Sequence, residues 1–509
     1  MYKPMKKINY VLDWGKYLSP NRMRDEGEQF PKGDSRASFE VDLRRVVFCP
    51  ALRRMHDKTQ VIPLSNGDSL LTRLTHSLQV MAVAESIAIR LTRNSTFREM
   101  YKEKAAVYAD SISSILRAAS LIHDIGNPPF GHFGEVSIQN HFKRYLNSRH
   151  IVTDEESYDF TEFDGNALGL RIVSKLQYTG TLDGLNLTCA TLGAYLKYPN
   201  KGKSEPNGYV GRHKHGVFKT EYDLFDMIVD SCQLRTPDGQ IKRHPLSFLV
   251  EAADSICYGI MDIEDGYNLR WYDFDAIVDF LNDYIENHVK EKRLLDPYRV
   301  SKVTGDEKKK VFSVEKLIGF SRDWNVGDVI APKDSRRLIV DFRDKLIDHL
   351  VKNVCEVFEN NLEAIDNGSF PEELLRVDDF RLSKALSAFT WRYIITNREV
   401  QQTELTGNSV ISGLLEILLK YCFHEDKKYR AKINAVIAMS RQEELIHEDK
   451  HSDLTINTLK AFTERDELWD YDIENLTPYS KLRVIVDFVG SMTDKFSVEL
   501  YQRLCGMTL

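Results

Sequence analysis

The sequence has no long apolar run, no cysteine motif and no excess of positive charge. No stretch of about 18 apolar residues is present, so we expect no membrane-spanning helix. The first residues, MYKPMKKINYVLDW, include lysines but not the apolar segment of a signal peptide, and we expect none. The seven cysteines are scattered and form no CxxC pair, which argues against a disulfide framework or a zinc finger and indicates reduced thiols in a cytoplasmic protein.

The chain has no excess of basic residues, which argues against a general nucleic-acid-binding protein. The chain carries 69 Lys and Arg residues against 76 Asp and Glu, a net charge of −7. A general nucleic-acid binder would favour a basic surface that neutralises phosphates. Any phosphate substrate must therefore be held by a local cluster of Lys, Arg or metal charge. The 509 residues are 42% hydrophobic and 28% charged, which is ordinary for a globular protein.

Strand-type alternation is also scarce, and residues 209–220 could form a hairpin at most. Steps of three and four between apolar residues instead predict helices, in 73–91, 111–122, 247–263, 410–421 and 480–488. The sequence therefore predicts an all-α, mainly helical fold.

The sequence also predicts where the second of these helices ends and which face of the first packs in the core. The second helix should end near Asp124, because Gly126 suits the C′ position and the prolines at 128 and 129 cannot continue a helix. The apolar spacing predicts that the core face of the first helix consists of Leu74, Leu78, Met81, Ala84, Ala88 and Leu91.

Four residues on or beside these helices could hold a metal ion. His76 lies on the first helix, His123 and Asp124 end the second, and Asp254 lies on the third. Two imidazoles and two carboxylates suit Mn²⁺, Mg²⁺, Fe²⁺ or Zn²⁺. At a helix end the backbone unwinds, so that an adjacent His-Asp pair can turn toward one ion. The alternative is an ordinary helix end with a capping histidine.

The segment around the His-Asp pair carries two more candidates for chemistry. Residues 121–135 read LIHDIGNPPFGHFGE, which adds His132 and Glu135 to the pair. Apolar residues flank His123 and Asp124, so a purely solvated pair is not expected. For His132 the alternative is packing in the loop. For Glu135 it is an acid favoured in the first turn of the next helix.

Several motifs together carry a resemblance to a known family. RLTHS at 73–77, HDIGNPPFGH at 123–132 and EAAD at 251–254 are similar to the H…HD…D signature of HD phosphohydrolases, and NPPFGHFGE resembles the deoxyguanosine triphosphate triphosphohydrolase (dGTPase) branch. The likeness covers about residues 7–494, with further matching segments at PALRR 50–54, KTQV 58–61, FDGNA 163–167, LKY 196–198, VISGLLE 410–416 and SMTD 491–494.

The resemblance implies an HD-domain helical core and a metal-dependent enzyme. Its reaction would be hydrolysis of dGTP, or of other deoxynucleoside triphosphates (dNTPs), at the α-phosphorus. The products would be a deoxynucleoside and inorganic triphosphate, which would control dNTP pools. His76, His123, Asp124 and Asp254 would bind Mn²⁺, Mg²⁺ or another transition metal. The resemblance also supports proton transfer by His132 to the leaving 5′-oxygen, with Glu135 holding that imidazole.

Contacts to the substrate are also implied by the resemblance. The triphosphate would be bound by Arg73, Lys197 with Tyr198, and Lys214, although a lone lysine is more often a solvated surface residue. The sugar and base would be contacted by Gln60, Tyr258, Asp262, Asn166 and Glu404. Asp262 could instead belong to a charged helix face together with Glu264 and Asp265. Family members often carry His-Phe-Glu-Gly-Asn where this chain has EFDGN at 162–166.

Other functions use the same ligand set. One alternative is a different HD nucleotidase or phosphodiesterase. The other is a regulator that binds nucleotides or single-stranded DNA on an HD scaffold. By analogy the chain should form a homo-oligomer, a hexamer, with single-stranded DNA or a nucleotide effector as further partners. The charged stretch 302–310 suggests a boundary, with an N-terminal segment and HD core in 1–300 and a helical region in 301–509 that completes the pocket and the oligomer contacts.

Overall fold

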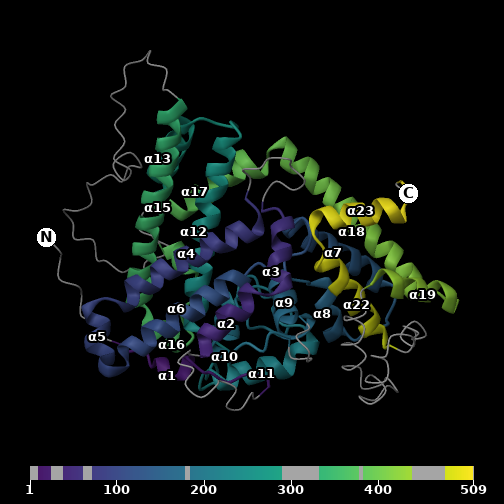
Figure 1. Cartoon of the computed structure of the whole chain (residues 1–509), viewed down its shortest axis with the longest axis horizontal. Helices are drawn as coiled ribbons and strands as arrows, with labels where there is room; N and C mark the ends of the chain where they lie inside the picture. The colour runs from purple at the N-terminus through teal and green to yellow at the C-terminus, as the bar shows by residue number, and fades with distance from the viewer. Residues whose placement is uncertain are drawn as a thin grey trace.

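Three long helices, α4 (Arg73–Thr92), α6 (Ala105–Ile122) and α12 (Pro245–Asn268), form the centre of the fold in the computed structural model (Figure 1). Helix α4 packs against α6, and α12 packs across both of them. Helix α10 (Cys189–Tyr195) lies against α6 and α12 on another side. The structure describes residues 10–24, 38–60, 71–177, 184–288, 332–377, 382–437 and 476–507.

The starts of α4 and α12 are set by capping side chains. The Thr72 hydroxyl accepts a hydrogen bond from the Thr75 amide, and the Thr75 side chain accepts one from the Thr72 amide, so that the two close a capping box. In α12, His244 caps the helix through the Leu246 amide and Pro245 occupies the first helical position. These caps determine where the helices that carry His76 and Asp254 begin.

The predicted core face of α4 is only partly correct. Ala84, Ala88 and Leu91 are buried, but Leu78 is 45% exposed. The buried stripe instead passes through Val80, Val83 and Ile87. Apolar residues occur on several sides of this helix, so their spacing does not by itself select the face that packs on α6.

The role predicted for Gly126 is also corrected. Helix α6 does end at Ile122, but Gly126 lacks the left-handed backbone that a C′ glycine usually adopts. A Cβ atom at Gly126 would lie 2.1 Å from both the Gly165 carbonyl oxygen and the Gly169 amide nitrogen. The residue must be glycine because the turn after His123-Asp124 touches the backbone of helix α9 (Gly165–Arg171).

The remaining helices surround this centre. The first half adds α1 (Trp14–Tyr17), α2 (Ser38–Val47), α3 (Pro50–Arg54), α5 (Ser95–Tyr101), α7 (His132–Asn147), α8 (Asp154–Thr161), α11 (Tyr222–Ser231) and α13 (Phe274–His288). The second half adds α15 (Pro332–Asn360), α16 (Leu362–Asp366), α17 (Leu382–Thr390), the π-helical turn η10 (Trp391–Ile395), α18 (Arg398–Cys422), α19 (Lys427–Val436), α22 (Pro478–Gly490) and α23 (Asp494–Leu504).

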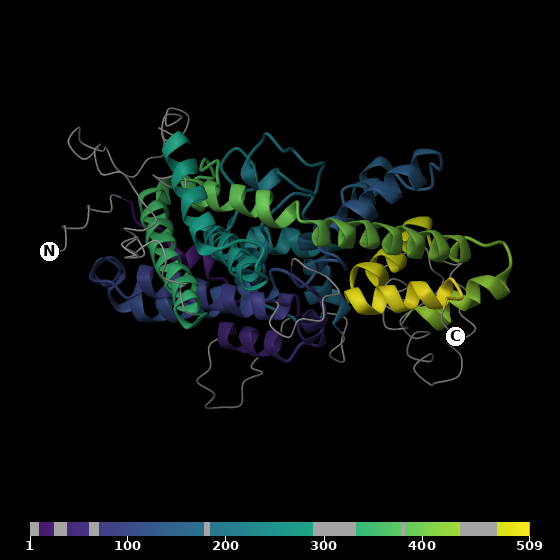
Figure 2. The ribbon, with the colours of Figure 1, turned by 90° about the horizontal axis from the view of Figure 1, so that it is seen from above.

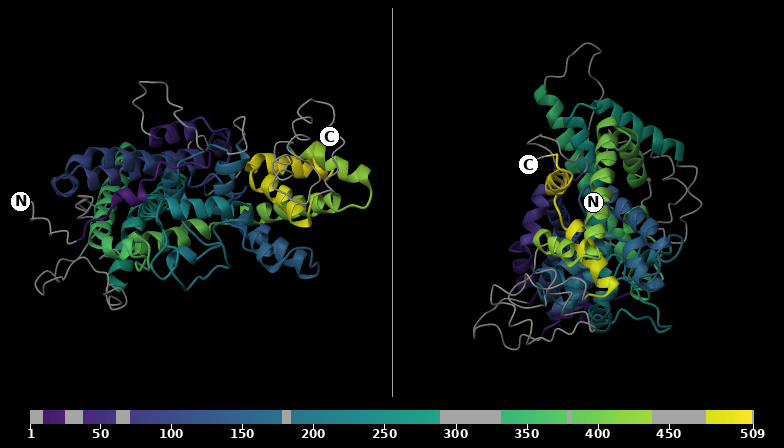
Figure 3. Two further views of the ribbon diagram at one scale, coloured as in Figure 1. Left: turned by 90° about the horizontal axis from the view of Figure 1, so that it is seen from below. Right: turned by 90° about the vertical axis from the view of Figure 1, so that its right-hand side faces the viewer.

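Helix α18 joins two parts of the molecule. Figure 2 shows it running from the central helices to a C-terminal group formed by α19, α22 and α23. It packs along α7 and against each of those three helices, and Figure 3 shows the same group at one end of the molecule. The boundary predicted near residue 300 lies outside the described residues. Helices from either side of it pack together, as α15 does on α4 and α12.

The described residues form helices and three isolated β-bridges but no β-strand. The hairpin considered for 209–220 is absent: this stretch holds two short 3₁₀ turns within a loop. One helical stretch, Ser95–Ile122, is long and apolar enough to cross a membrane by length and composition alone, but 56% of its apolar window is buried inside the fold. All seven cysteines are free thiols, as predicted, and only Cys505 is exposed.

Candidate active site

A cavity of about 350 Å³ opens where α4, α7, α10 and α12 meet the start of α18. This volume lies in the range of small-molecule sites. Its wall is lined by twelve of the fifteen predicted site residues, namely Gln60, Arg73, His123, Asp124, His132, Glu135, Asn166, Lys197, Tyr198, Lys214, Asp254 and Tyr258. Further lining residues were not predicted, among them Asn127, Phe130, Glu251, Ile395 and Val400.

The four predicted metal ligands meet at one end of this cavity. Ligand atoms of His76, His123 and Asp124 lie within 4.8 Å of one another. The fourth, Asp254, places its Oδ1 3.0 Å from His76 Nε2 and 3.4 Å from His123 Nε2. His76 is buried directly behind the cavity wall, with 1% of its surface exposed.

The state of His123 indicates that a cation fits among these groups. Its Nδ1 donates to the Ser120 carbonyl at 2.7 Å, so Nε2 is the nitrogen left to act as a ligand. That Nε2 is buried and lacks a hydrogen-bond partner in the described chain, while carboxylate oxygens of Asp124 and Asp254 lie 3.5 and 3.4 Å away. Burial opposes protonation, yet these two carboxylates raise the pKa of His123 to about 9. A divalent cation would satisfy the same demand for positive charge.

Asp124 is oriented by two neighbours that bind it from the cavity side. Arg73 donates to Oδ2 at 2.6 Å, and the Asn127 amide donates to Oδ1 at 2.7 Å. Asn127 lies within the GNPP turn that follows the His-Asp pair, so the turn itself contributes a partner to the carboxylate. Arg73 thus contacts the predicted metal ligand Asp124 and lines the cavity at the same time, one helical turn before His76.

His132 and Glu135 form a dyad at the first turn of α7. His132 Nδ1 lies 2.9 Å from Glu135 Oε2, and the Glu135 Oε1 accepts the Gly165 amide at 2.8 Å. The His132 side chain is 76% exposed, whereas that of Glu135 is 5% exposed. The charge of Glu135 and its hydrogen bond raise the pKa of His132. Burial opposes ionisation of Glu135, but Lys214 and His132 hold its pKa down to about 2. An accessible imidazole with a raised pKa suits a proton donor.

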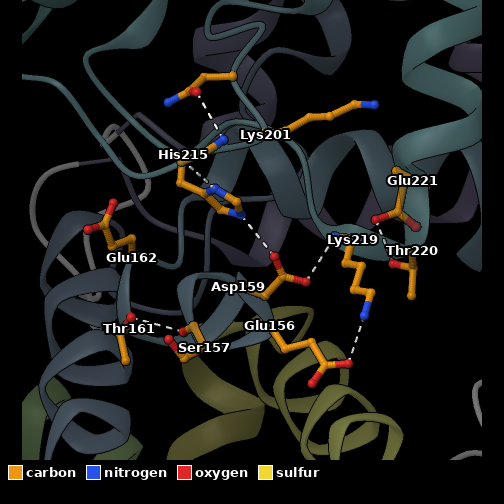
Figure 4. A network of polar contacts seen from close by, with 12 residues as sticks. Glu156, Ser157, Asp159, Thr161, Glu162, Lys201, His215, Lys219, Thr220 and Glu221 are labelled. Carbon is orange, nitrogen blue, oxygen red and sulfur yellow. Dashed lines mark hydrogen bonds and ion pairs between the residues drawn. The ribbon is translucent and has the colours of Figure 1, made fainter. Parts of the chain in front are cut away.

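Lys214 reaches the cavity from a loop that a buried histidine anchors. Its Nζ lies 2.6 Å from Asp164 Oδ2 and 3.8 Å from Glu135 Oε2. The next residue, His215, is fully buried, and its Nδ1 donates to the Gly202 carbonyl at 2.9 Å. Its Nε2 contacts Asp159 at 2.9 Å, and Figure 4 shows the two side chains facing each other. Both partners are acceptors, so both ring nitrogens carry protons. Burial opposes that charge, but the bond to Asp159 raises the pKa of His215.

Asp159 connects the Lys214 loop to the rest of the fold. Its second oxygen accepts the Lys219 amide at 3.0 Å and the Tyr479 hydroxyl of α22 at 2.5 Å. The Lys219 ammonium in turn lies 2.8 Å from Glu156 of α8, as Figure 4 shows. The loop is therefore tied to both α8 and α22.

Lys197 is held by a second buried chain of charges. Glu251, one turn before Asp254, lies 3.4 Å from Lys197 Nζ and 2.7 Å from Arg243 Nη1. Arg243 is fully buried, so it fixes the carboxylate rather than meeting a ligand. Burial opposes the charge on Lys197, but Tyr198 and Glu251 raise its pKa above the ordinary value.

The other predicted substrate residues divide into two groups. Gln60, Asn166 and Tyr258 line the cavity. Asp262 and Glu404 are not among the lining residues: Asp262 is buried two turns beyond Asp254, and Glu404 is half-exposed on α18, one turn beyond the lining residue Val400. Asp262 is only 2% exposed, so it does not belong to a solvated charged face. Burial raises the pKa of Asp262 well above its ordinary value, which favours a neutral carboxylic acid.

The charges in the cavity wall do not suffice for a triphosphate. Three cations, Arg73, Lys197 and Lys214, face four carboxylates, Asp124, Glu135, Glu251 and Asp254. Each cation is already paired with a carboxylate. A polyanion would therefore require a further positive charge at the ligand cluster.

Comparisons with known proteins show which proteins this chain resembles. The HD domain family matches residues 73–176, a range that includes His76, His123 and Asp124 but ends before Asp254. A deoxyguanosinetriphosphate triphosphohydrolase-like protein of Listeria innocua is 32% identical over 98% of this chain and all of its own length. One from Synechocystis is 30% identical over the same shares, and a deoxyguanosinetriphosphate triphosphohydrolase of Enterobacter is 30% identical over 92% of this chain and 94% of its own. The chain therefore belongs to the deoxyguanosinetriphosphate triphosphohydrolase family of HD-domain phosphohydrolases.

Proposed function

We propose that the protein hydrolyses dGTP, and other deoxynucleoside triphosphates after it, to a deoxynucleoside and inorganic triphosphate, and that it thereby controls dNTP pools. One observation carries this proposal. A single cavity of nucleotide-binding size joins a two-histidine, two-carboxylate cluster, a histidine–glutamate dyad and three cations. The reaction breaks the bond between the α-phosphorus and the 5′-oxygen. The attacking water oxygen becomes part of the triphosphate.

His76, His123, Asp124 and Asp254 would hold the metal ion, for which Mn²⁺ or Mg²⁺ suit the ligand set. When bound, a divalent cation there would polarise the phosphate and lower the pKa of a bound water. The protein's own contribution is to hold these ligands in one orientation. Ser120 fixes the ring of His123, while Arg73 and Asn127 fix Asp124.

The remaining side chains would bind and protonate the substrate. Lys197 and Lys214 would exchange their carboxylate partners for phosphate oxygens. Arg73 would keep Asp124 on Nη1 and contact phosphate with its other N–H groups. His132 would donate its proton to the leaving 5′-oxygen, and Glu135 would keep that imidazole protonated and oriented.

Recognition of the nucleoside would use the other end of the cavity. Tyr258 lies one helical turn beyond Asp254, so its ring can lie beside a deoxyribose and exclude a 2′-hydroxyl. Gln60 and the neutral acid of Asp262 would bind the 3′-hydroxyl: within the described chain Gln60 Oε1 and Asp262 Oδ2 are buried without a hydrogen-bond partner. Asn166 and Glu404 would contact the base. The carboxylate of Glu404 would accept the guanine N–H groups.

The reaction is tested by product analysis. Purified protein is incubated with each deoxynucleoside triphosphate and Mn²⁺ or Mg²⁺, and the products are separated by ion-exchange chromatography. We expect deoxynucleoside and intact triphosphate, with dGTP turned over fastest and ribonucleotides excluded. Monophosphate and pyrophosphate would instead assign the protein to another nucleotidase class. Glu404→Gln should reduce the preference for dGTP over the other three. Glu399→Gln, on the same helix and more exposed than Glu404, serves as the control.

The Glu135→Gln variant should lose activity at alkaline pH sooner than the wild type. Glu135 raises the pKa of His132, mainly through its charge, so removing that charge lowers the pKa. A proton donor is active below its pKa, and the alkaline limb of the kcat/KM profile must then move to lower pH. Glutamine keeps an oxygen for the Gly165 amide, which preserves the fold. An unchanged alkaline limb would show that His132 is not the group that titrates.

Three broader assignments complete the proposal. The protein acts in the cytoplasm, where its seven free thiols remain reduced. Residues 1–300 supply the HD core, and residues 301–509 complete the pocket through η10 and α18 and make the contacts of a hexamer. The subunit mass in solution decides the last point, and a monomer at working concentration would contradict it.

A further inference from the structure

The GSMTD segment at the start of α23 has no role in the reaction described so far, although it ends beside the cavity. Asp494 is the first residue of α23, after the N-cap Thr493, and is only 3% exposed. Its two carboxylate oxygens have separate partners. Oδ1 accepts the Phe130 amide and Oδ2 accepts the Thr59 amide, each at 3.0 Å.

The first partner belongs to the turn that aims His132. Phe130 has a φ of +63°, which a non-glycine residue rarely adopts, and Gly131 follows with a φ of +58°. Helix α7 then begins at His132 without a side-chain cap. Within this turn the Gly131 amide donates to the Pro128 carbonyl at 3.0 Å. The Phe130 amide, two residues before His132, instead donates to Asp494 and so ties the turn to α23.

The second partner belongs to the segment that carries Gln60. Thr59 pairs with Thr72 in an isolated antiparallel bridge, and the Gln60 amide donates to the Leu71 carbonyl at 3.3 Å. The Arg73 amide donates to the Lys58 carbonyl at 2.9 Å, so this short ladder ends at the start of α4. Asp494 thus also fixes the backbone beside Gln60 and Arg73.

We propose that Asp494 is a positioning residue that holds the His132 turn and the Gln60 segment in register, so that the C-terminal helix α23 sets the geometry of the reaction site. This inference rests on the proposed function for its catalytic consequence, but the clamp itself is defined by two hydrogen bonds. One carboxylate binds both Phe130 and Thr59, which precede Asp494 by 364 and 435 positions in the chain. A change of about 1 Å in the position of a reacting group can cost on the order of 10²-fold in rate.

The clamp is tested by amide hydrogen exchange and by kinetics on the full-length protein. Asp494→Ala removes both acceptors, and Asp494→Asn keeps the size of the side chain but offers only one. Glu499→Gln, on the solvent side of the same helix, is the matched control with 44% side-chain exposure. We expect amide exchange at both Thr59 and Phe130 to accelerate at least tenfold in Asp494→Ala. In Asp494→Asn we expect exchange to accelerate at only one of these two amides. The asparagine variant keeps the test possible if the alanine variant does not fold.

The kinetic test separates positioning from general stability. Asp494→Ala should lower kcat on the order of 10²-fold, with Glu499→Gln at the wild-type rate. If Asp494 acts through His132, its effect on the residual kcat should shrink to under about threefold in the His132→Ala background, because the two changes are then not additive. Native exchange rates in Asp494→Ala, or a fall in kcat that is fully additive with His132→Ala, would overturn the proposal. If amide exchange accelerates in the Asp494 variants as expected but the wild-type protein releases no triphosphate, the clamp would be supported and the proposed reaction refuted.

Discussion

Replacing His123 and Asp124 together by alanine should eliminate measurable hydrolysis of every nucleotide, a loss on the order of 10⁴-fold or more, as when one member of a catalytic unit is removed. The two residues would supply adjacent metal ligands just after α6, and no other sequence-adjacent His-Asp pair in the described chain lines the cavity. Binding of Mn²⁺ should be lost in parallel, which titration calorimetry measures without any turnover.

The chain contains a matched control for this double variant. His56 and Asp57 are also an adjacent His-Asp pair, but their side chains are 71% and 67% exposed and lie outside the cavity lining. His56→Ala/Asp57→Ala should bind Mn²⁺ and turn over dGTP like the wild type. Equal losses in the two double variants would mean that the His123-Asp124 pair does not bind the metal.

The fold of the first variant has to be verified, because Asp124 pairs with a buried arginine. Removing one partner of a buried ion pair costs about 3–5 kcal/mol, and Arg73 would lose the carboxylate at 2.6 Å. Asp124→Asn keeps an oxygen for that guanidinium and disturbs the fold less. It should still weaken Mn²⁺ binding and turnover, and wild-type values in a folded Asp124→Asn protein would contradict the ligand assignment.

The His132→Ala variant should bind dGTP nearly as well as the wild type but hydrolyse it on the order of 10²- to 10⁴-fold more slowly, the usual range for loss of a general acid. His132 meets the cavity with an exposed ring and is not one of the clustered ligands, so its removal leaves the metal and the three cations in place. Single-turnover rates and equilibrium binding measure the two quantities separately.

A second histidine on the same helix provides the comparison for His132. His141 lies further along α7, stacks on Tyr145 and does not line the cavity, so His141→Ala should retain the wild-type rate. If His132→Ala raised the dissociation constant of dGTP and left kcat unchanged, His132 would be a binding residue. A rate loss below tenfold would require another proton donor for the 5′-oxygen.

Much of this site could be predicted from the sequence because its chemistry is concentrated in short segments. The fifteen residues of 121–135 hold two of the four proposed metal ligands and the His132–Glu135 dyad, so their closeness along the chain already places them near one another. Helix periodicity likewise predicted α4, α6 and α12, since it depends on contacts between residues three and four apart. These features require only local geometry.

Other features depend on contacts between distant parts of the chain. The buried face of α4 differs from the predicted one because apolar residues lie on several sides of that helix, and only packing against α6 selects among them. Gly126 is required by the backbone of α9, not by the helix end beside it. Arg243 holds Glu251 and through it Lys197, although nothing in the spacing of these residues indicates a chain of charges.

The sequence by itself thus determined the helical class, the reactive segment and, through its motifs, the family. Only the tertiary structure decided how the side chains are held: Asp159 and His215 lie behind Lys214, Asp494 lies behind the His132 turn, and burial raises the pKa of Asp262. The physical reason is range. Periodicity and capping are set by neighbours within one or two turns. Hydrogen bonds and desolvation inside a core are set by groups tens to hundreds of residues away, whose approach leaves no local pattern in the chain.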